Sequence, residues 1–108
     1  MNYNIIVTPE FLKEAKKLGK KYPSLKEDLS ILFVELEQNP TLGTALGDNC
    51  YKVRLAIKSK GKGKSGEARI ITHIIIDNET VFLLSLYDKS EKDSISNKEI
   101  KVLLRLIK

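Results

Sequence analysis

The sequence is short of the residues that build disulfides and metal sites. Its 108 residues include one cysteine, Cys50, one histidine, His73, and no tryptophan. One cysteine cannot form an intrachain disulfide, and a zinc site built from several cysteines is excluded in the same way. Any closed metal site would have to depend mainly on carboxylates. We therefore expect a protein that uses no metal ion and no other cofactor.

Long apolar stretches are also missing. No unbroken apolar run exceeds four residues, as in Val81–Leu84, which is too short to cross a membrane. The N-terminus lacks the basic-then-apolar layout of a signal peptide, so we expect a cytoplasmic protein with no membrane partner. A length of 108 residues suits one domain spanning 1–108, and 42% hydrophobic beside 31% charged residues is typical of a globular chain.

Acidic residues are missing from one segment of the chain. The net charge is only +5, yet six basic residues and no acid lie between Cys50 and Gly66. The remainder of the chain is therefore close to neutral. Such a segment indicates either a polyanionic partner, above all nucleic acid, or a solvated lysine-rich loop. The six residues are Lys52, Arg54, Lys58, Lys60, Lys62 and Lys64.

Apolar residues at helical spacing predict two helices in the N-terminal half. Thr8 can cap a helix that begins at Pro9, and Pro23 ends it. Ser24 and Glu27 have capping-box spacing for a second helix, which is predicted to form a hairpin with the first. Residues 41 to 49 show little periodicity and are predicted to be a loop.

Four segments have the composition or the alternation of β-strands. They are residues 3–7, 51–58, 68–76 and 80–87. Short connections between the last three favour antiparallel pairing. Capping-box spacing of Ser96 and Glu99 then precedes a helical stripe that runs to the C-terminus. The predicted fold is α+β in the order β-α-α-β-β-β-α, with a helical hairpin and a C-terminal helix packed on a mostly antiparallel sheet of about four strands.

Alternation along the strands gathers cationic and aromatic side chains on one face of this sheet. We expect the helices to cover the opposite face, which carries Val53, Leu55, Ile70, Ile74, Leu84 and Leu86. The uncovered face would then present Arg54, Lys58, Arg69, His73, Tyr87 and Lys89, with Lys60, Lys62 and Lys64 at its rim. A cationic, partly aromatic surface of this kind suits RNA.

These segments resemble the RelE/ParE superfamily of type II toxins, and more closely its HigB-like members. The resemblance rests on residues 51–56 (YKVRLA), 58–66 (KSKGKGKSG), 68–71 (ARII) and 83–91 (LLSLYDKSE), and it covers nearly the whole chain. It implies a RelE-like fold and a metal-independent, ribosome-dependent mRNA endonuclease that inhibits translation. Its partners would be mRNA in the A site of the 30S subunit and a cognate antitoxin that holds the toxin inactive.

The resemblance also implies roles for individual residues. Arg69 matches the arginine that contacts the reacting phosphate, and Arg54 falls at a basic position of the active face. Tyr87 and Lys89 match the functional end of the last strand, and we add Lys58 from the same cationic face to this catalytic set. The residues expected to bind RNA are Lys52, Lys60, Lys62, Lys64 and His73.

Structural alternatives stand beside these roles. Glu67, where relatives commonly have a small residue, could pair with Arg69 and weaken phosphate binding. Tyr87 could be an aromatic at the edge of the core, and His73 a packed neutral imidazole among isoleucines. Cys50, which has no evident base partner, is predicted to be a small buried hydrophobe.

Two alternative functions share the same sequence features. A ParE-like toxin would inhibit DNA gyrase without catalysis and would not need a phosphate-binding arginine. A non-catalytic nucleic-acid-binding module would bind RNA through the same cationic face but would leave it intact. A gyrase supercoiling assay tests the first alternative, and comparing RNA binding with RNA cleavage tests the second.

Overall fold

The helices of the N-terminal half form where the sequence predicts them. The computed structural model describes residues 2–60, 67–89 and 94–107. Strand β1 (Asn4–Val7) leads into helix α1 (Pro9–Lys21), and the Thr8 hydroxyl accepts a hydrogen bond from the Phe11 N–H, which confirms the predicted cap. Helix α2 (Leu25–Gln38) follows after a short turn.

The start of α2 differs from the prediction. Ser24 makes no capping hydrogen bond through its side chain, so the predicted capping box with Glu27 is wrong. The physical reason is that the Ser24 hydroxyl is engaged elsewhere, because it donates to the Asp28 carboxylate at 2.7 Å. The capping box of helix α3 (Asn97–Arg105), which joins Ser96 and Glu99, is present as predicted.

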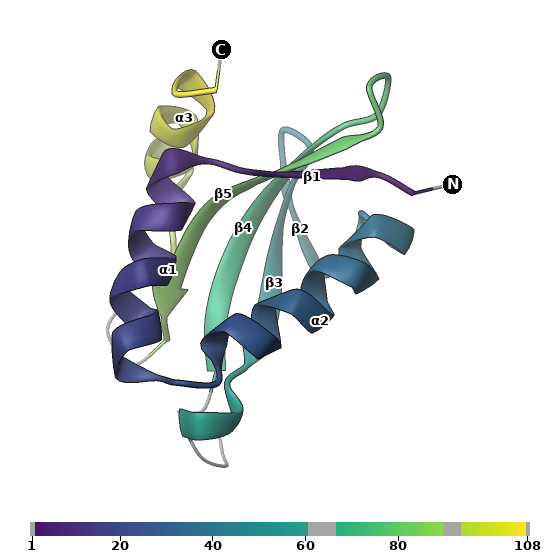
Figure 1. Ribbon diagram of the computed structural model, residues 1–108. Helices are drawn as coiled ribbons and strands as arrows, with labels where there is room; N and C mark the ends of the chain where they lie inside the picture. The colour runs from purple at the N-terminus through teal and green to yellow at the C-terminus, as the bar shows by residue number, and fades with distance from the viewer. Residues whose placement is uncertain (1, 61–66, 90–93, 108) are drawn as a thin grey trace.

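A single mixed sheet joins the strands of the described ranges in the order β1-β5-β4-β3-β2 (Figure 1). β1 pairs in parallel with β5, and the other neighbours are antiparallel. The α+β fold is therefore confirmed, with five strands rather than about four. The remaining strands are β2 (Thr44–Gly47), β3 (Cys50–Ala56), β4 (Glu67–Ile75) and β5 (Thr80–Asp88).

The additional strand, β2, lies in the segment predicted to be a loop. Asp48 and Asn49 have φ angles of 53° and 58°, and this left-handed pair closes a tight hairpin between β2 and β3. Gly43 precedes β2 with a φ of 101°, and a Cβ there would overlap the Lys52 carbonyl oxygen. The loop prediction failed because β2 is short and partly exposed, so its side chains show no clear alternation.

The helices cover both faces of the sheet, not one. α1 and α2 diverge from their common turn over the same face (Figure 1), where their apolar residues pack with Val53, Ile70 and Leu86. Ile100 of α3 packs on the other face with Ile71. The cationic face is therefore covered in part by α3, because the apolar residues on this face of the sheet also need a partner.

A β-bulge explains why one predicted residue changes face. Ile71 pairs with Ser85, but the next residue, Thr72, pairs with Leu83. The extra residue, Leu84, joins the cluster of Ile71 and Ile100 under α3. Its predicted place beside Leu86 is wrong, because one inserted residue reverses the alternation along β5. No described helix is long and apolar enough to span a membrane.

Candidate active site

Three of the predicted site residues form one row across the three central strands of the sheet, near the ends of β3 and β5 and the start of β4. Arg54 of β3 pairs with Arg69 of β4, and Arg69 pairs with Tyr87 of β5. Directly paired residues point to the same face, and neighbouring strands lie about 4.8 Å apart. The alternation had placed these side chains on one face, and the register brings them next to one another.

The middle member of this row is buried and ion-paired. Arg69 Nη1 lies 3.0 Å from Glu67 Oε1, and the Arg69 side chain is only 6% exposed. The expectation that Arg69 is exposed is therefore wrong, because the side chains of Arg54 and Tyr87 lie on either side of it and Glu67 pairs with it on the same face. The predicted alternative, an ion pair with Glu67, is present.

Electrostatics join Glu67 to the cations around it. The hydrogen bond from Arg69 lowers the pKa of the Glu67 carboxyl below its ordinary value. Burial, the second-largest effect, opposes this shift, and the positive charges of Arg69, Arg54 and Lys89 add to it. Glu67 therefore lies within reach of three of the predicted catalytic residues. It is an ionised counterion at neutral pH, and sequence reasoning had left it outside the candidate set.

Lysines follow the ends of the two outer strands of the row. Lys89 comes directly after β5, and its N–H donates to the Glu67 carbonyl at 3.4 Å. Lys58 begins a short 3-10 turn after β3, and its Nζ lies 3.9 Å from Glu27 Oε1. The side chains of Lys58 and Glu27 are both largely exposed, so their ion pair contributes little stability and leaves Lys58 accessible.

The lysine-rich segment lies mostly outside the described residues. The side chain of Lys60 and all of Lys62 and Lys64 belong to that part, so their predicted contacts with RNA stay predictions. Lys52 is described, and it is half-buried opposite Ile71 on the face of Arg54.

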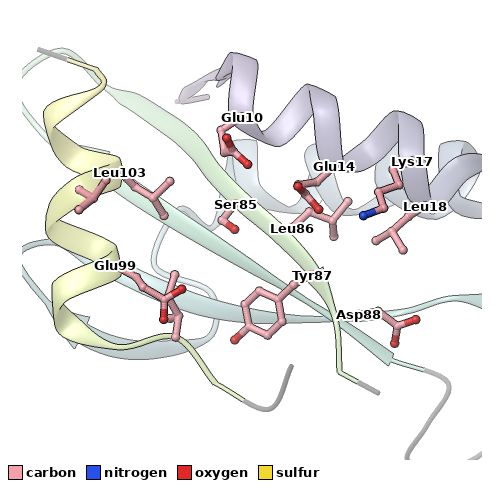
Figure 2. A pocket seen from close by; sticks show the side chains of 12 residues that line it. Glu10, Glu14, Lys17, Leu18, Ser85, Leu86, Tyr87, Asp88, Glu99 and Leu103 are labelled. Carbon is pink, nitrogen blue, oxygen red and sulfur yellow. The ribbon is translucent and has the colours of Figure 1, made fainter. Parts of the chain in front are cut away.

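Tyr87 is the member of the row that lies on β5, and its side chain is buried. The side chain is 7% exposed and packs in the cluster beneath α3 with Leu84 and Ile100. Figure 2 shows Tyr87 and Asp88 leaving the end of β5 in opposite directions. Tyr87 therefore occupies the edge of the core, as in the structural alternative that the sequence left open, while it stays beside Arg69 in the row.

A cavity of about 430 Å³ lies beside the end of β5, between α1 and α3 (Figure 2). Its lining includes Glu10, Glu14 and Glu99, with Lys17 as the only basic residue among the lining residues. Negative charge of this kind repels a phosphate backbone. The side of the row that carries Arg54 and Lys58 is therefore the more cationic one.

His73 and Cys50 lie apart from the row. His73 is four residues beyond Arg69 on β4, or about 13 Å at the usual rise of a strand. Its Nδ1 lies 3.5 Å from the Sγ of Cys50, which is buried as predicted. Burial, with a smaller contribution from Asp48, raises the pKa of Cys50 to about 11, so the group is a thiol at neutral pH.

Metal-ligating side chains do not gather in the described ranges. No three histidine, cysteine, aspartate or glutamate residues there are grouped as a metal site would require. The arginines of the row offer the chemistry of cations, because arginine binds phosphate oxygens through a planar fork and stays charged at any physiological pH.

Comparison with known proteins identifies the family of this chain. The model of one family, described as the RelE toxin of the RelE/RelB toxin-antitoxin system, matches residues 5–108. The chain belongs to the RelE toxin family. As a RelE-family toxin, it is a toxin of the type II toxin–antitoxin class.

Solved structures share the fold of this RelE-family toxin. A mutant of E. coli toxin RelE in the free state is 24% identical and covers 86% of this chain and 90% of its own, with a TM-score of 0.63. The intact E. coli RelBE toxin-antitoxin complex contains a chain that is 26% identical, with 80% and 95% covered and a TM-score of 0.60. A RelE mutant in complex with an antitoxin RelBc peptide is 22% identical, with 90% and 98% covered and a TM-score of 0.60.

Proposed function

We propose that this RelE-family toxin is a metal-independent endoribonuclease that cleaves mRNA on the ribosome. The observation that carries the proposal is the row of Arg54, Arg69 and Tyr87 on adjacent strands, with Lys89 and Lys58 at the strand ends. Two arginines about one strand spacing apart are close enough to contact the oxygens of the same phosphate.

The proposed reaction uses the RNA itself as nucleophile. The 2′-OH loses its proton and attacks the adjacent phosphorus, a new O–P bond forms, and the bond to the 5′ oxygen breaks as that oxygen takes up a proton. Stabilising the charge that develops on the phosphate oxygens is the larger catalytic effect, and Arg69 has that role in our proposal. General acid–base help contributes on the order of 10²–10⁴-fold.

Glu67 is poorly suited to be the base. Its lowered pKa makes it a weak proton acceptor at neutral pH, whereas a general base works best with a pKa near the working pH. We assign it the role of holding Arg69, since a guanidinium has five N–H donors and the pair with Glu67 is formed through one nitrogen. Proton transfer is assigned to the end of β5, where Lys89 and Tyr87 lie.

A cognate antitoxin is the expected protein partner. Two of the related structures are complexes of RelE with antitoxin RelB or a piece of it. By analogy, co-expression with an antitoxin of this kind should restore the growth of cells that produce the toxin.

Induced expression in bacteria tests the proposal. We expect growth arrest, a stop in protein synthesis and new 5′ ends within translated messages when these are mapped by primer extension. Cleavage should persist with a chelator of transition metals that leaves ribosomal magnesium in place. Arrest with intact messages and loss of supercoiling would instead show a gyrase inhibitor, and RNA binding without cleavage would show a non-catalytic module.

A further inference from the structure

We propose that the corner between α1 and α2, residues 22 to 28, positions the candidate active site from the opposite face of the sheet. Side chains of this corner hold the ends of β3 and β5, the two strands that carry Lys58 and Lys89. The inference rests on the proposed function for its catalytic meaning, but the hydrogen bonds that carry it are independent of that function.

The first of these contacts holds the end of β5. The Tyr22 hydroxyl donates a hydrogen bond of 2.9 Å to Asp88 Oδ2, across 66 positions of sequence. Tyr22 is 9% and Asp88 1% exposed, so the bond is sheltered from water. A hydrogen bond to a charged carboxylate is stronger than one between neutral groups. Asp88 lies between Tyr87 and Lys89, so its anchorage fixes both neighbours.

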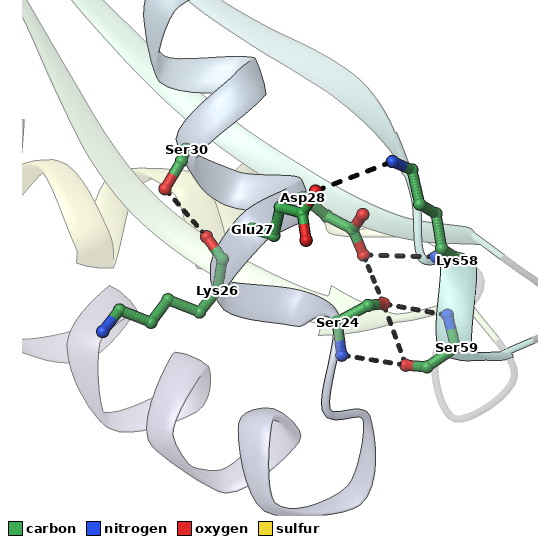
Figure 3. Close-up of polar contacts among 7 residues, drawn as sticks. All are labelled: Ser24, Lys26, Glu27, Asp28, Ser30, Lys58 and Ser59. Atoms are coloured by element: carbon green, nitrogen blue, oxygen red, sulfur yellow. Dashed lines mark hydrogen bonds and ion pairs between the residues drawn. The ribbon is translucent and has the colours of Figure 1, made fainter.

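The second contact holds the end of β3 (Figure 3). The Ser24 N–H donates to Ser59 Oγ at 3.1 Å, and the Ser59 N–H donates back to Ser24 Oγ at 2.8 Å. The buried Asp28 carboxylate joins the pair, because its Oδ2 accepts from the Ser24 hydroxyl at 2.7 Å and from the Lys58 N–H at 3.2 Å. Two backbone N–H groups after β3 are therefore bonded to the corner.

The location of these contacts gives them a role beyond general stability. Pairing within the sheet fixes β3 as far as Ala56, and β5 as far as Asp88. Lys58 lies beyond the last paired residue of β3. Lys89 lies beyond that of β5, and the long bond of 3.4 Å from its N–H to the Glu67 carbonyl holds it to β4 only weakly. Because β4 separates β3 from β5, the corner is an element that ties the two strand ends to each other.

The two contacts should affect different steps. Lys58 is exposed and leads into the lysine-rich segment, so loosening the Ser24–Ser59 contact should weaken RNA binding. Lys89 and Tyr87 are the proposed proton-transfer residues, so loosening the Tyr22–Asp88 contact should slow the chemical step. A displacement of about 1 Å in an active site can cost on the order of 10²-fold in rate.

Two single-atom deletions with matched controls test the inference. Tyr22→Phe and Ser24→Ala each remove one hydroxyl. Tyr3→Phe changes a partly buried tyrosine on β1's side of the sheet, and Ser30→Ala removes a hydroxyl that bonds within α2, to the Lys26 carbonyl at 3.0 Å. Ser24→Thr keeps the hydroxyl and should behave like the wild type.

Backbone hydrogen exchange provides a readout that does not depend on activity. We expect Ser24→Ala to speed exchange at the Lys58 and Ser59 N–H groups, and Tyr22→Phe to speed it at Lys89, by about two- to tenfold, the scale of one net hydrogen bond. The controls should leave these groups unchanged. Unchanged exchange in the two test variants would overturn the inference.

Kinetics on ribosome-bound mRNA test the catalytic half. We expect Tyr22→Phe to lower the rate at saturating ribosomes about tenfold or more, with KM within about twofold. Ser24→Ala should raise KM and flatten the salt dependence of RNA binding while sparing the saturating rate. If the cleavage activity of every variant falls in proportion to its melting temperature, with no difference between rate and KM effects, the positioning role is overturned. If the wild-type protein cleaves no RNA, but the two variants still show the local changes in exchange, the proposed function is overturned and the two contacts are confirmed.

Discussion

Glu67 and Arg69 form an ion pair of 3.0 Å on one face of β4, so the arginine expected to bind phosphate already holds a carboxylate. The pair lies at the boundary of the core, with 27% of the Glu67 side chain exposed but only 6% of that of Arg69. Phosphate must therefore either share the guanidinium with Glu67 or displace it. Substitution of each partner separates these possibilities.

Removing the charge of Glu67 should change stability in a pH-dependent way. Its folded-state pKa lies below the ordinary value of 4.5, so the ion pair stabilises the fold above that pH and loses its effect as pH falls through the folded pKa. We expect Glu67→Gln to be less stable than the wild type at pH 7 and equally stable at pH well below 4.5. Urea unfolding across this pH range measures the difference.

Glu35→Gln is the control for this titration, because Glu35 is exposed on α2. If Glu67→Gln also increases RNA affinity while cleavage falls, Glu67 competes with phosphate and positions Arg69 at the same time. Equal stability of Glu67→Gln and wild type at every pH would contradict a stabilising ion pair.

Arg69 should be the most sensitive position for cleavage. We expect Arg69→Ala to lower the cleavage rate by about 10²-fold or more, the scale of losing one preorganised charge-stabilising group. Arg69→Lys should recover only part of the rate, since an ammonium does not reproduce the planar fork. Growth after induction and primer extension measure the effect.

Because Arg69 is buried, its removal should also lower the stability of the fold, which the removal of an exposed arginine would not do. Arg69→Ala leaves Glu67 without this partner, so we expect a loss of about 1 kcal/mol in the free energy of unfolding. Arg105→Ala, at an exposed position of α3, is the matched control for both measurements. A folded, fully toxic Arg69→Ala variant would place the active site elsewhere.

The lysine-rich segment should supply salt-dependent affinity. Alanine at Lys60, Lys62 and Lys64 together should weaken RNA binding and leave the cleavage position unchanged. Each lysine that neutralises a phosphate contributes about 0.7 to the slope of log K against log salt on single-stranded RNA, so the slope should flatten by about two. The control variant removes three exposed lysines of α1, Lys13, Lys16 and Lys20. An unchanged slope would show that the segment does not contact phosphates.

Local signals in the sequence were sufficient for several elements of the fold. The caps at Thr8 and Ser96 are confirmed, since a cap is complete within four residues. Alternation in β3 correctly gave the face of Arg54, because successive side chains of a strand point to opposite faces and the apolar ones identify the face that meets the core.

Relations between distant segments could not be predicted in the same way. The bulge that turns Leu84 toward α3 depends on how β4 and β5 pair, and neither strand shows it alone. The enclosure of Arg69 depends on both neighbouring strands. The contact of Tyr22 with Asp88 joins residues 66 positions apart, and no pattern in either segment marks it.

Cys50 should react slowly with thiol reagents in the folded protein. It is 1% exposed and its pKa is raised to about 11, so both access and the thiolate fraction are low at pH 8. We expect alkylation to be slow until the protein is unfolded in urea, and Cys50→Ala to retain cleavage. Two results together would contradict this prediction: fast alkylation of the folded protein with loss of cleavage, and loss of cleavage in Cys50→Ala. They would show that the Cys50 thiol takes part in cleavage.

Arg54 tests whether the row acts as one unit. Arg54 is exposed and Arg69 enclosed, so we expect Arg54→Ala to reduce cleavage with little change in melting temperature. If both arginines hold the same phosphate in the transition state, removal of one already misplaces it, and the second removal should cost less. The double variant should therefore lose less than the product of the two single losses. If the loss in the double variant equals the product of the two single losses, Arg54 and Arg69 contact different phosphates. If Arg54→Ala cleaves at the wild-type rate, the active site involves β4 and β5 but not Arg54 of β3.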